Sequence, residues 1–88
     1  MSIAHRLTVL VADDTNTDRL ILETIVRKDG HRVVSAENGR EAVERFKAER
    51  PDLVLLDALM PEMDGFEAAR QIKQLAGDEL VPIIFLTS

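Results

Sequence analysis

The sequence predicts an α/β domain, with an open parallel sheet and helices on both of its faces. Short apolar runs rich in β-branched residues alternate with longer segments of helical periodicity. The two clearest runs, residues 7–12 and 53–56, each lead directly into aspartate. The 88 residues contain no repeat and no internal linker. One domain covering residues 1–88 is therefore expected.

The first half of the chain predicts two strands and a helix between them. Residues 7–12 form a buried strand, and residues 32–36 form a shorter one. A helix over residues 17–28 is predicted from apolar residues near helical spacing, with Thr15 or Asn16 as N-cap and Gly30 just beyond its end. Its apolar residues are Leu20, Ile21, Ile25 and Val26.

The second half continues the alternation. A second helix covers residues 40–49, and Pro51 ends it by disfavouring helical geometry at the preceding residue. Residues 53–56 form the third strand and residues 83–87 the fourth. A third helix ends at Gly77 and is marked by Phe66, Ala69, Ile72 and Leu75. Phe46 and Phe66 are both expected in the core, on the apolar faces of their helices. The order βαβαβαβ implies a parallel sheet.

Composition excludes several classes of function. A net charge of −5 makes nucleic acid an unfavourable direct ligand, because phosphate backbones are bound through clustered Lys and Arg. The chain has no cysteine, which excludes disulfides, thiolate catalysis and Cys-ligated zinc. No apolar stretch approaches the ~20 residues of a membrane span, and residues 1–8 lack the apolar run of a signal peptide. We expect a cytoplasmic protein without membrane contact.

Three aspartates are the candidate metal-binding and reactive residues. Asp13 and Asp14 follow the first strand and Asp57 follows the third, so all three belong to the edge where parallel sheets bind ligands. Clustered carboxylates repel one another unless a cation or a proton relieves them. Magnesium suits such an oxygen-rich cluster, and Asp57 beside it could attack phosphorus as a nucleophile. Taken alone, an Asp-Asp pair after a strand is more commonly an N-cap and loop pair than a metal site.

The motifs around these aspartates resemble the receiver domains of bacterial two-component response regulators. The resemblance is carried by four segments in matching order and separation: residues 10–14 (LVADD), 53–57 (LVLLD), 60–65 (MPEMDG) and 82–87 (PIIFLT). It implies a flavodoxin-like sheet in the order 2-1-3-4. The first helix would cover one face, and the second and third helices the other.

The resemblance also assigns roles to particular residues. It implies that Asp57 accepts a phosphoryl group and that Asp13 and Asp14 form the acidic pocket, with Asp14 the more direct metal ligand. The metal would be Mg²⁺, with Mn²⁺ as the alternative, held by Asp13, Asp14, Asp57 and the backbone carbonyl of Leu59. Thr87 matches the family's switch hydroxyl, which turns inward to bind a phosphoryl oxygen.

Two features of the family have no counterpart in these 88 residues. The family's lysine at the end of a fifth strand is absent, as are the fourth helix, that strand and the fifth helix. The sequence therefore corresponds to the N-terminal two-thirds to three-quarters of a receiver domain, truncated after the fourth strand, and phosphotransfer on it is expected to be impaired. Without a last helix, half of one sheet face is expected to be bare, which predicts a homodimer through that face or strand exchange.

The leading prediction of function is a phosphorylatable switch rather than an enzyme. A sensor histidine kinase or phosphotransfer protein would donate to Asp57, and an output domain or effector protein would respond. One alternative is a truncated or degenerate receiver that serves as a docking or dimerisation module. Another is an aspartyl phosphohydrolase, but such enzymes place a second aspartate two residues after the nucleophile, where this chain has Leu59.

Overall fold

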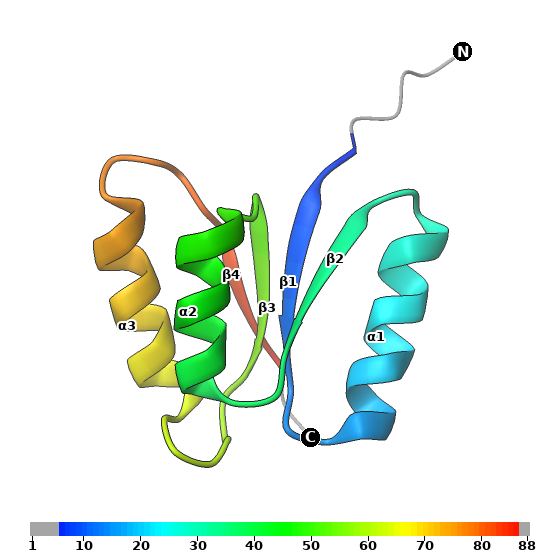
Figure 1. Ribbon diagram of the computed structural model, residues 1–88, viewed down its shortest axis with the longest axis horizontal. Coiled ribbons are helices and arrows are strands. Elements are labelled where there is room, and N and C mark those ends of the chain that lie inside the picture. Colours follow the sequence, from blue (N-terminus) through cyan, green and yellow to red (C-terminus); the bar gives the residue numbers. More distant parts are fainter. Residues whose placement is uncertain (1–5, 87–88) are drawn as a thin grey trace.

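The computed structural model describes residues 6–86, which alternate strictly between strand and helix (Figure 1). The elements are β1 (Thr8–Ala12), α1 (Asn16–Lys28), β2 (Arg32–Ala36), α2 (Gly39–Glu49), β3 (Leu53–Asp57), α3 (Gly65–Ala76) and β4 (Ile83–Leu86). The predicted order of elements is confirmed. Among these residues no helix has both the length and the apolar character needed to cross a membrane.

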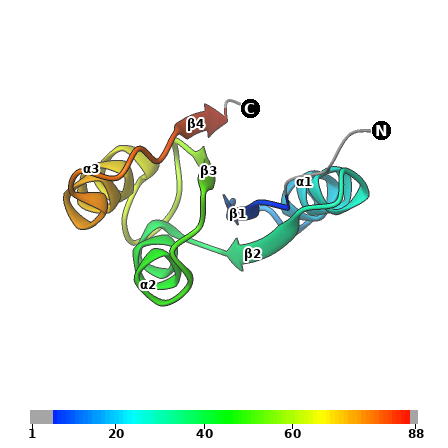
Figure 2. The ribbon, with the colours of Figure 1, turned by 90° about the horizontal axis from the view of Figure 1, so that it is seen from above.

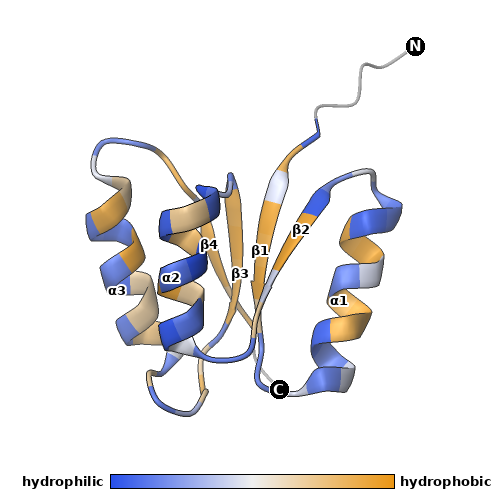
Figure 3. Cartoon of the chain, viewed as in Figure 1, coloured by the Kyte–Doolittle hydropathy of each residue, from blue (hydrophilic) through white to orange (hydrophobic). Residues whose placement is uncertain are grey.

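The four strands form one parallel sheet in the order β2-β1-β3-β4, as expected. Ala12 pairs with both Ala36 and Leu56, so β1 and β2 end at the same level and β3 ends one residue beyond it. Because neighbouring parallel strands run in register, the residues after β1 lie beside the last residue of β3. The strands are hydrophobic along most of their length (Figure 3), which matches burial by helices on both sides.

The main core lies between the sheet and the layer formed by α2 and α3, which Figure 2 shows on the same side of the sheet. Leu10 and Leu56 point into it from the strands, and Phe46 and Ile72 reach it from the helices; all four are at most 1% exposed. Burying such side chains stabilises a fold by ~1.5–3 kcal/mol each. This core fixes β1 against β3 and therefore the position of the aspartates.

Helix α1 covers the opposite face, beside β1 and β2 (Figure 2). Val9 and Val11 are buried there, but the one buried residue of α1 is the charged Glu23. Three of the four apolar residues that predicted this helix are more than half exposed: Leu20, Ile21 and Ile25. Within the described residues α1 is the single helix on this face, and Ile84 of β4 is 50% exposed. Within the described residues this side of β4 is therefore partly exposed.

Hydrogen bonds at the starts of α1, α2 and α3 fix the loops that precede them. Asn38 caps α2 through a hydrogen bond from Glu41 N, and Asp64 caps α3 through one from Glu67 N. Such caps satisfy backbone donors that have no partner within the helix. Thr15 occupies the N-cap position of α1, but its side chain makes no capping hydrogen bond. Instead its backbone N–H donates to Asp13 Oδ1 at 2.9 Å, so an aspartate of the cluster shapes the start of this helix.

Two sequence predictions need correction. Asp57 is the last residue of β3 rather than the residue after it, because it still pairs with Leu86 of β4. Phe66 is 59% exposed and is not a core residue; its ring lies 4.9 Å from that of Phe85. The buried face of α3 is centred on Gly65, Ile72 and Ala76, and Phe66 lies roughly 100° around the helix axis from Gly65.

Candidate functional site

The sheet brings Asp13, Asp14 and Asp57 together at the carboxyl ends of β1 and β3. One carboxylate oxygen from each lies within 4.8 Å of those of the other two. The in-register pairing of Ala12 with Leu56 places Asp13 next to Asp57, and Asp14 follows it. The convergence predicted from the sequence is confirmed for these three residues.

The three carboxylates occupy different environments. Asp13 is buried, at 5% exposure, and its backbone N–H donates to Ala36 O at 3.1 Å, which ties it to the end of β2. Asp14 is exposed. Asp57 is half-buried, and its Oδ1 accepts a hydrogen bond from Leu59 N at 3.1 Å. Asp13 is thus part of the framework, whereas Asp14 and Asp57 face the solvent.

The clustering changes the acidity of Asp57. Desolvation is the largest cause that raises its pKa above the ordinary 3.8, and the negative charges of Asp13 and Asp14 raise it further. The hydrogen bond from Leu59 N acts in the opposite direction but does not cancel the increase. Asp57 therefore carries its negative charge at an energetic cost, which a cation at this position would remove.

An open cavity of about 440 Å³ lies over the cluster. Its described lining residues include four aspartates and no basic residue: Asp13, Asp14, Thr15, Asp18, Ile21, Leu22, Asp57, Leu59 and Leu86. Hard divalent cations prefer carboxylate and carbonyl oxygens, and Mg²⁺ commonly keeps several waters. An open cavity with clustered carboxylates fits such a partly hydrated ion, so the donor set suits Mg²⁺ or Mn²⁺.

The loop between β3 and α3 follows Asp57 and contributes Leu59 to the cavity. Met60 is buried, and Glu62 has a left-handed backbone with φ 67°. Met63 packs against the first turn of α2 so closely that a Cβ on Gly39 would lie 1.9 Å from Met63 O. The loop is therefore an ordered structure held against α2.

The remaining site predictions have different outcomes. Leu59 lines the cavity and is 74% exposed, which is compatible with a main-chain role. Thr87 lies outside the described residues, so its predicted switch role stays a prediction. Sequence reasoning missed Asp18 in the cavity wall and Arg19, whose side chain contacts the backbone of Asp13. The spacing of Arg19 and Glu23 on one helix face was the available signal.

Comparison with known proteins places the chain in a family. The family described as "Response regulator receiver domain" matches residues 9–88. Protein PilH of Pseudomonas aeruginosa is 39% identical over 80 residues, which are 91% of this chain and 66% of PilH. Chemotaxis protein CheY of Bacillus subtilis is 47% identical over 74 residues, which are 83% of this chain and 60% of that protein.

A solved structure agrees with these matches. The CheX–CheY–BeF3–Mg²⁺ complex from Borrelia burgdorferi matches with a TM-score of 0.81 and 31% identity, over 89% of this chain and 59% of the matched chain. The chain thus spans about two-thirds or less of the length of these relatives. Together with the strand order 2-1-3-4, the match confirms the flavodoxin-like fold. The chain belongs to the response-regulator receiver family.

Proposed function

We propose that this chain is a phosphorylatable signalling switch whose acceptor is Asp57. The donor would be a sensor histidine kinase or a phosphotransfer protein. The observation that carries the proposal is the convergence of Asp13, Asp14 and Asp57 within 4.8 Å in an open cavity. Family membership supports the same role, because receiver domains take part in phosphoacceptor signalling.

The chemistry needs one carboxylate oxygen of Asp57 to reach phosphorus. The hydrogen bond from Leu59 N holds Oδ1, which makes Oδ2 the candidate attacking oxygen. Its attack on a phosphohistidine forms an O–P bond while the P–N bond breaks; the electron pair stays on the imidazole nitrogen, which then takes up a proton. The product is an acyl phosphate on Asp57, and water can later hydrolyse it to carboxylate and inorganic phosphate.

Asp13, Asp14, Asp57 and the carbonyl of Leu59 would hold Mg²⁺, or Mn²⁺ in its place. A bound divalent ion would neutralise the clustered carboxylates and draw the phosphoryl oxygens toward Asp57. The raised pKa of Asp57 supports a cation here, because the metal-free cluster penalises its ionised form. The Mg²⁺ in the Borrelia burgdorferi CheX–CheY complex supports the same choice of ion.

An output domain or effector protein would read the phosphorylated state, with Thr87 as the switch hydroxyl. The protein would act in the cytoplasm and as an acceptor rather than as a turnover enzyme. The identity of Leu59 argues against the hydrolase alternative, because such enzymes place a second aspartate at this position and leucine cannot transfer a proton.

Intact-protein mass spectrometry after incubation with acetyl phosphate tests the proposal. The unmodified chain should gain one phosphoryl mass when Mg²⁺ is present, and the adduct should be labile to base. Asp57→Asn should gain none. Asp78→Asn is the matched control, since Asp78 is exposed and lies in the loop before β4, at the opposite end of the strands. A gain in Asp57→Asn, or none in the unmodified chain, would refute phosphotransfer to Asp57 on this chain.

A second candidate, a dimerisation or docking module, is favoured by one observation. Leu20, Ile21 and Ile25 of α1 and Ile84 of β4 expose between 50% and 58% of their surface on the partly covered face. Exposed apolar groups of this kind favour association. Sedimentation at tens of micromolar should show a dimer that Ile25→Glu disrupts and Thr24→Glu, a polar exposed neighbour, leaves intact. A monomer in all three proteins would exclude self-association through this face.

A further inference from the structure

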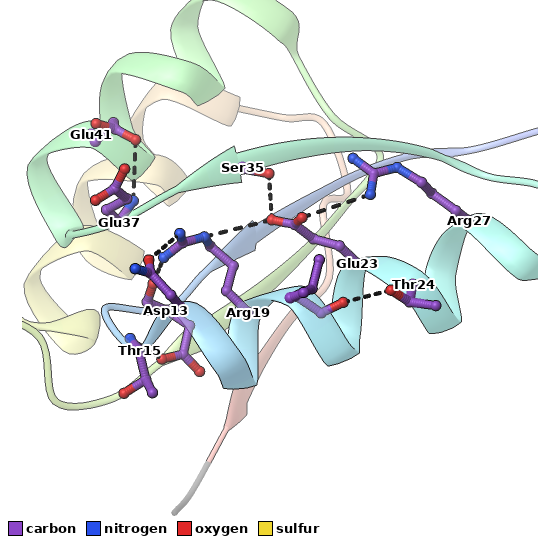
Figure 4. A network of polar contacts seen from close by, with 11 residues as sticks. Asp13, Thr15, Arg19, Glu23, Thr24, Arg27, Ser35, Glu37 and Glu41 are labelled. Carbon is purple, nitrogen blue, oxygen red and sulfur yellow. Dashed lines mark hydrogen bonds and ion pairs between the residues drawn. The ribbon is translucent and has the colours of Figure 1, made fainter.

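A line of polar contacts connects β2 to the backbone of the acidic cluster (Figure 4). Ser35 Oγ donates a hydrogen bond to Glu23 Oε2 at 2.5 Å, and the same oxygen lies 3.6 Å from Arg19 Nε. Arg19 Nη1 then donates to the backbone carbonyl of Asp13 at 2.8 Å. A side chain of α1 thus binds the main chain of a residue in the cluster.

Arg19 is held firmly enough to act as a fixed support. Its side chain is only 14% exposed, and its remaining amino group, Nη2, donates to Asn16 Oδ1 at 2.5 Å. All three nitrogens of the guanidinium are therefore engaged, by a carboxylate, a carbonyl and an amide. Since the guanidinium is planar and rigid, these contacts fix its orientation as well as its position.

The carbonyl that Arg19 binds belongs to the peptide between Asp13 and Asp14. The same residue is already held at two other atoms, because its N–H donates to Ala36 O and its Oδ1 accepts from Thr15 N. Arg19 adds the third restraint and fixes the plane of the peptide that leads to Asp14. Asp14 is exposed and directly follows this peptide, so the orientation of the peptide contributes to where its carboxylate lies.

We propose that Arg19 is a positioning residue for the metal site, with Glu23 and Ser35 holding Arg19 in place; this inference rests on the metal binding in the proposed function. Arg19 acts on the backbone of Asp13, and its charge is balanced by Glu23. Substituting a residue that orients a metal ligand commonly lowers metal affinity by about 10 to 100-fold.

Charge and positioning predict opposite results when Arg19 is removed. Loss of a positive charge near three carboxylates should strengthen the binding of a cation by Coulomb's law. Loss of a positioning contact should weaken it. Arg27 provides the matched control. It also pairs with Glu23, at 3.7 Å, but its side chain is 55% exposed.

The test is a calorimetric titration of the full chain with Mg²⁺, since the absence of Trp and Tyr leaves fluorescence without a strong reporter. Arg19→Gln should bind Mg²⁺ about ten-fold more weakly. Arg27→Gln should stay within about two-fold of the unmodified chain, because exposed charges are screened. Arg19→Lys keeps the charge but cannot serve three acceptors in a plane, so it should resemble Arg19→Gln. Equal or tighter binding by Arg19→Gln, or equal weakening by Arg27→Gln, would overturn the inference.

A second measurement, on metal-free protein, separates this inference from the proposed function. The Thr15 amide, which donates to Asp13 Oδ1, should exchange its hydrogen faster in Arg19→Gln than in Arg27→Gln, with urea unfolding used to verify that both variants fold. If the unmodified chain fails to bind Mg²⁺, the metal part of the proposed function fails, while faster exchange still supports positioning. An unchanged exchange rate of the Thr15 amide in Arg19→Gln would overturn the positioning role of Arg19, whether or not Mg²⁺ binds.

Discussion

Gly65 lies directly behind Asp57: a Cβ atom on Gly65 would come within 2.1 Å of the Asp57 carbonyl oxygen. Gly65 N also donates to Ala58 O at 2.9 Å, so the first turn of α3 rests against the end of β3. Contact this close leaves no space for any side chain. Gly65 therefore sets the distance between α3 and the candidate acceptor.

Substituting Gly65 with alanine should destabilise the chain and disturb the site together. The new methyl group must push α3 away from Asp57, and overpacking of this kind costs ~1–3 kcal/mol. The free energy of unfolding in urea measures the loss, and Mg²⁺ affinity should fall in the same variant. Gly30→Ala is the control, because nothing lies within 4 Å of its Cβ and only its φ of 89° opposes alanine. Equal Mg²⁺ affinity in both variants would contradict a role for Gly65 at the site.

Asp57→Asn should stabilise the metal-free protein at neutral pH. Burial and the neighbouring carboxylates raise the pKa of Asp57 above 3.8, so its protonated form contributes stability that is complete below pH 3.8 and lost as pH rises through the folded-state pKa. Asparagine cannot ionise and avoids this loss. Urea midpoints in EDTA should be higher for Asp57→Asn than for the unmodified chain at pH 7 and should converge below pH 3.8. A lower midpoint for Asp57→Asn at pH 7 would argue against the raised pKa.

Glu67 should titrate far below an ordinary glutamate. Hydrogen bonds from Arg70 and Gln71 lower its pKa from 4.5 to about 2, with Arg70 the larger cause. Its contribution to stability is therefore present above pH 4.5 and lost as pH falls toward 2. Carboxyl NMR titration of the unmodified chain should give a midpoint near 2. In Arg70→Gln the midpoint should move back toward 4.5, and a midpoint unchanged by that substitution would assign the shift to another group.

Sequence patterns predicted the strands and helices, which depend on local sequence. They failed to predict the burial of side chains that depends on tertiary contacts. The apolar runs leading to Asp13 and Asp57 were sufficient to place both residues at one sheet edge, because parallel strands share their carboxyl ends. Phe66 was misplaced since its apolar character says nothing about which side of α3 packs. Helical periodicity could not predict the burial of Glu23 either, because its hydrogen-bond partner is Ser35 of β2, twelve residues away in the chain.

Asp64 should prove to be a helix cap rather than a metal ligand. Its Oδ1 accepts a hydrogen bond from Glu67 N at 2.9 Å, and it is not one of the three clustered carboxylates. Asp64→Ala should lower the free energy of unfolding by about 1 kcal/mol, whereas Asp64→Asn, which can still accept the bond, should lose only a small part of this. Urea unfolding measures both. A large loss of Mg²⁺ affinity in Asp64→Asn would instead indicate a part in the metal site.

Asp14 and Asp18 provide the sharpest test of which carboxylates hold the cation. Both line the cavity and both are exposed, but only Asp14 is among the three whose oxygens lie within 4.8 Å of one another. A unit charge at ~4 Å contributes a few kcal/mol in a partly screened site, so Asp14→Asn should weaken Mg²⁺ binding by at least about ten-fold. Asp18→Asn removes the same charge from the cavity wall, where water and salt screen it, and should weaken binding by less than about three-fold. Calorimetric titration of the two variants measures the difference. Equal losses would mean that the cavity attracts cations through its overall charge and that no defined ligand set exists, which would remove the structural basis for placing Mg²⁺ beside Asp57.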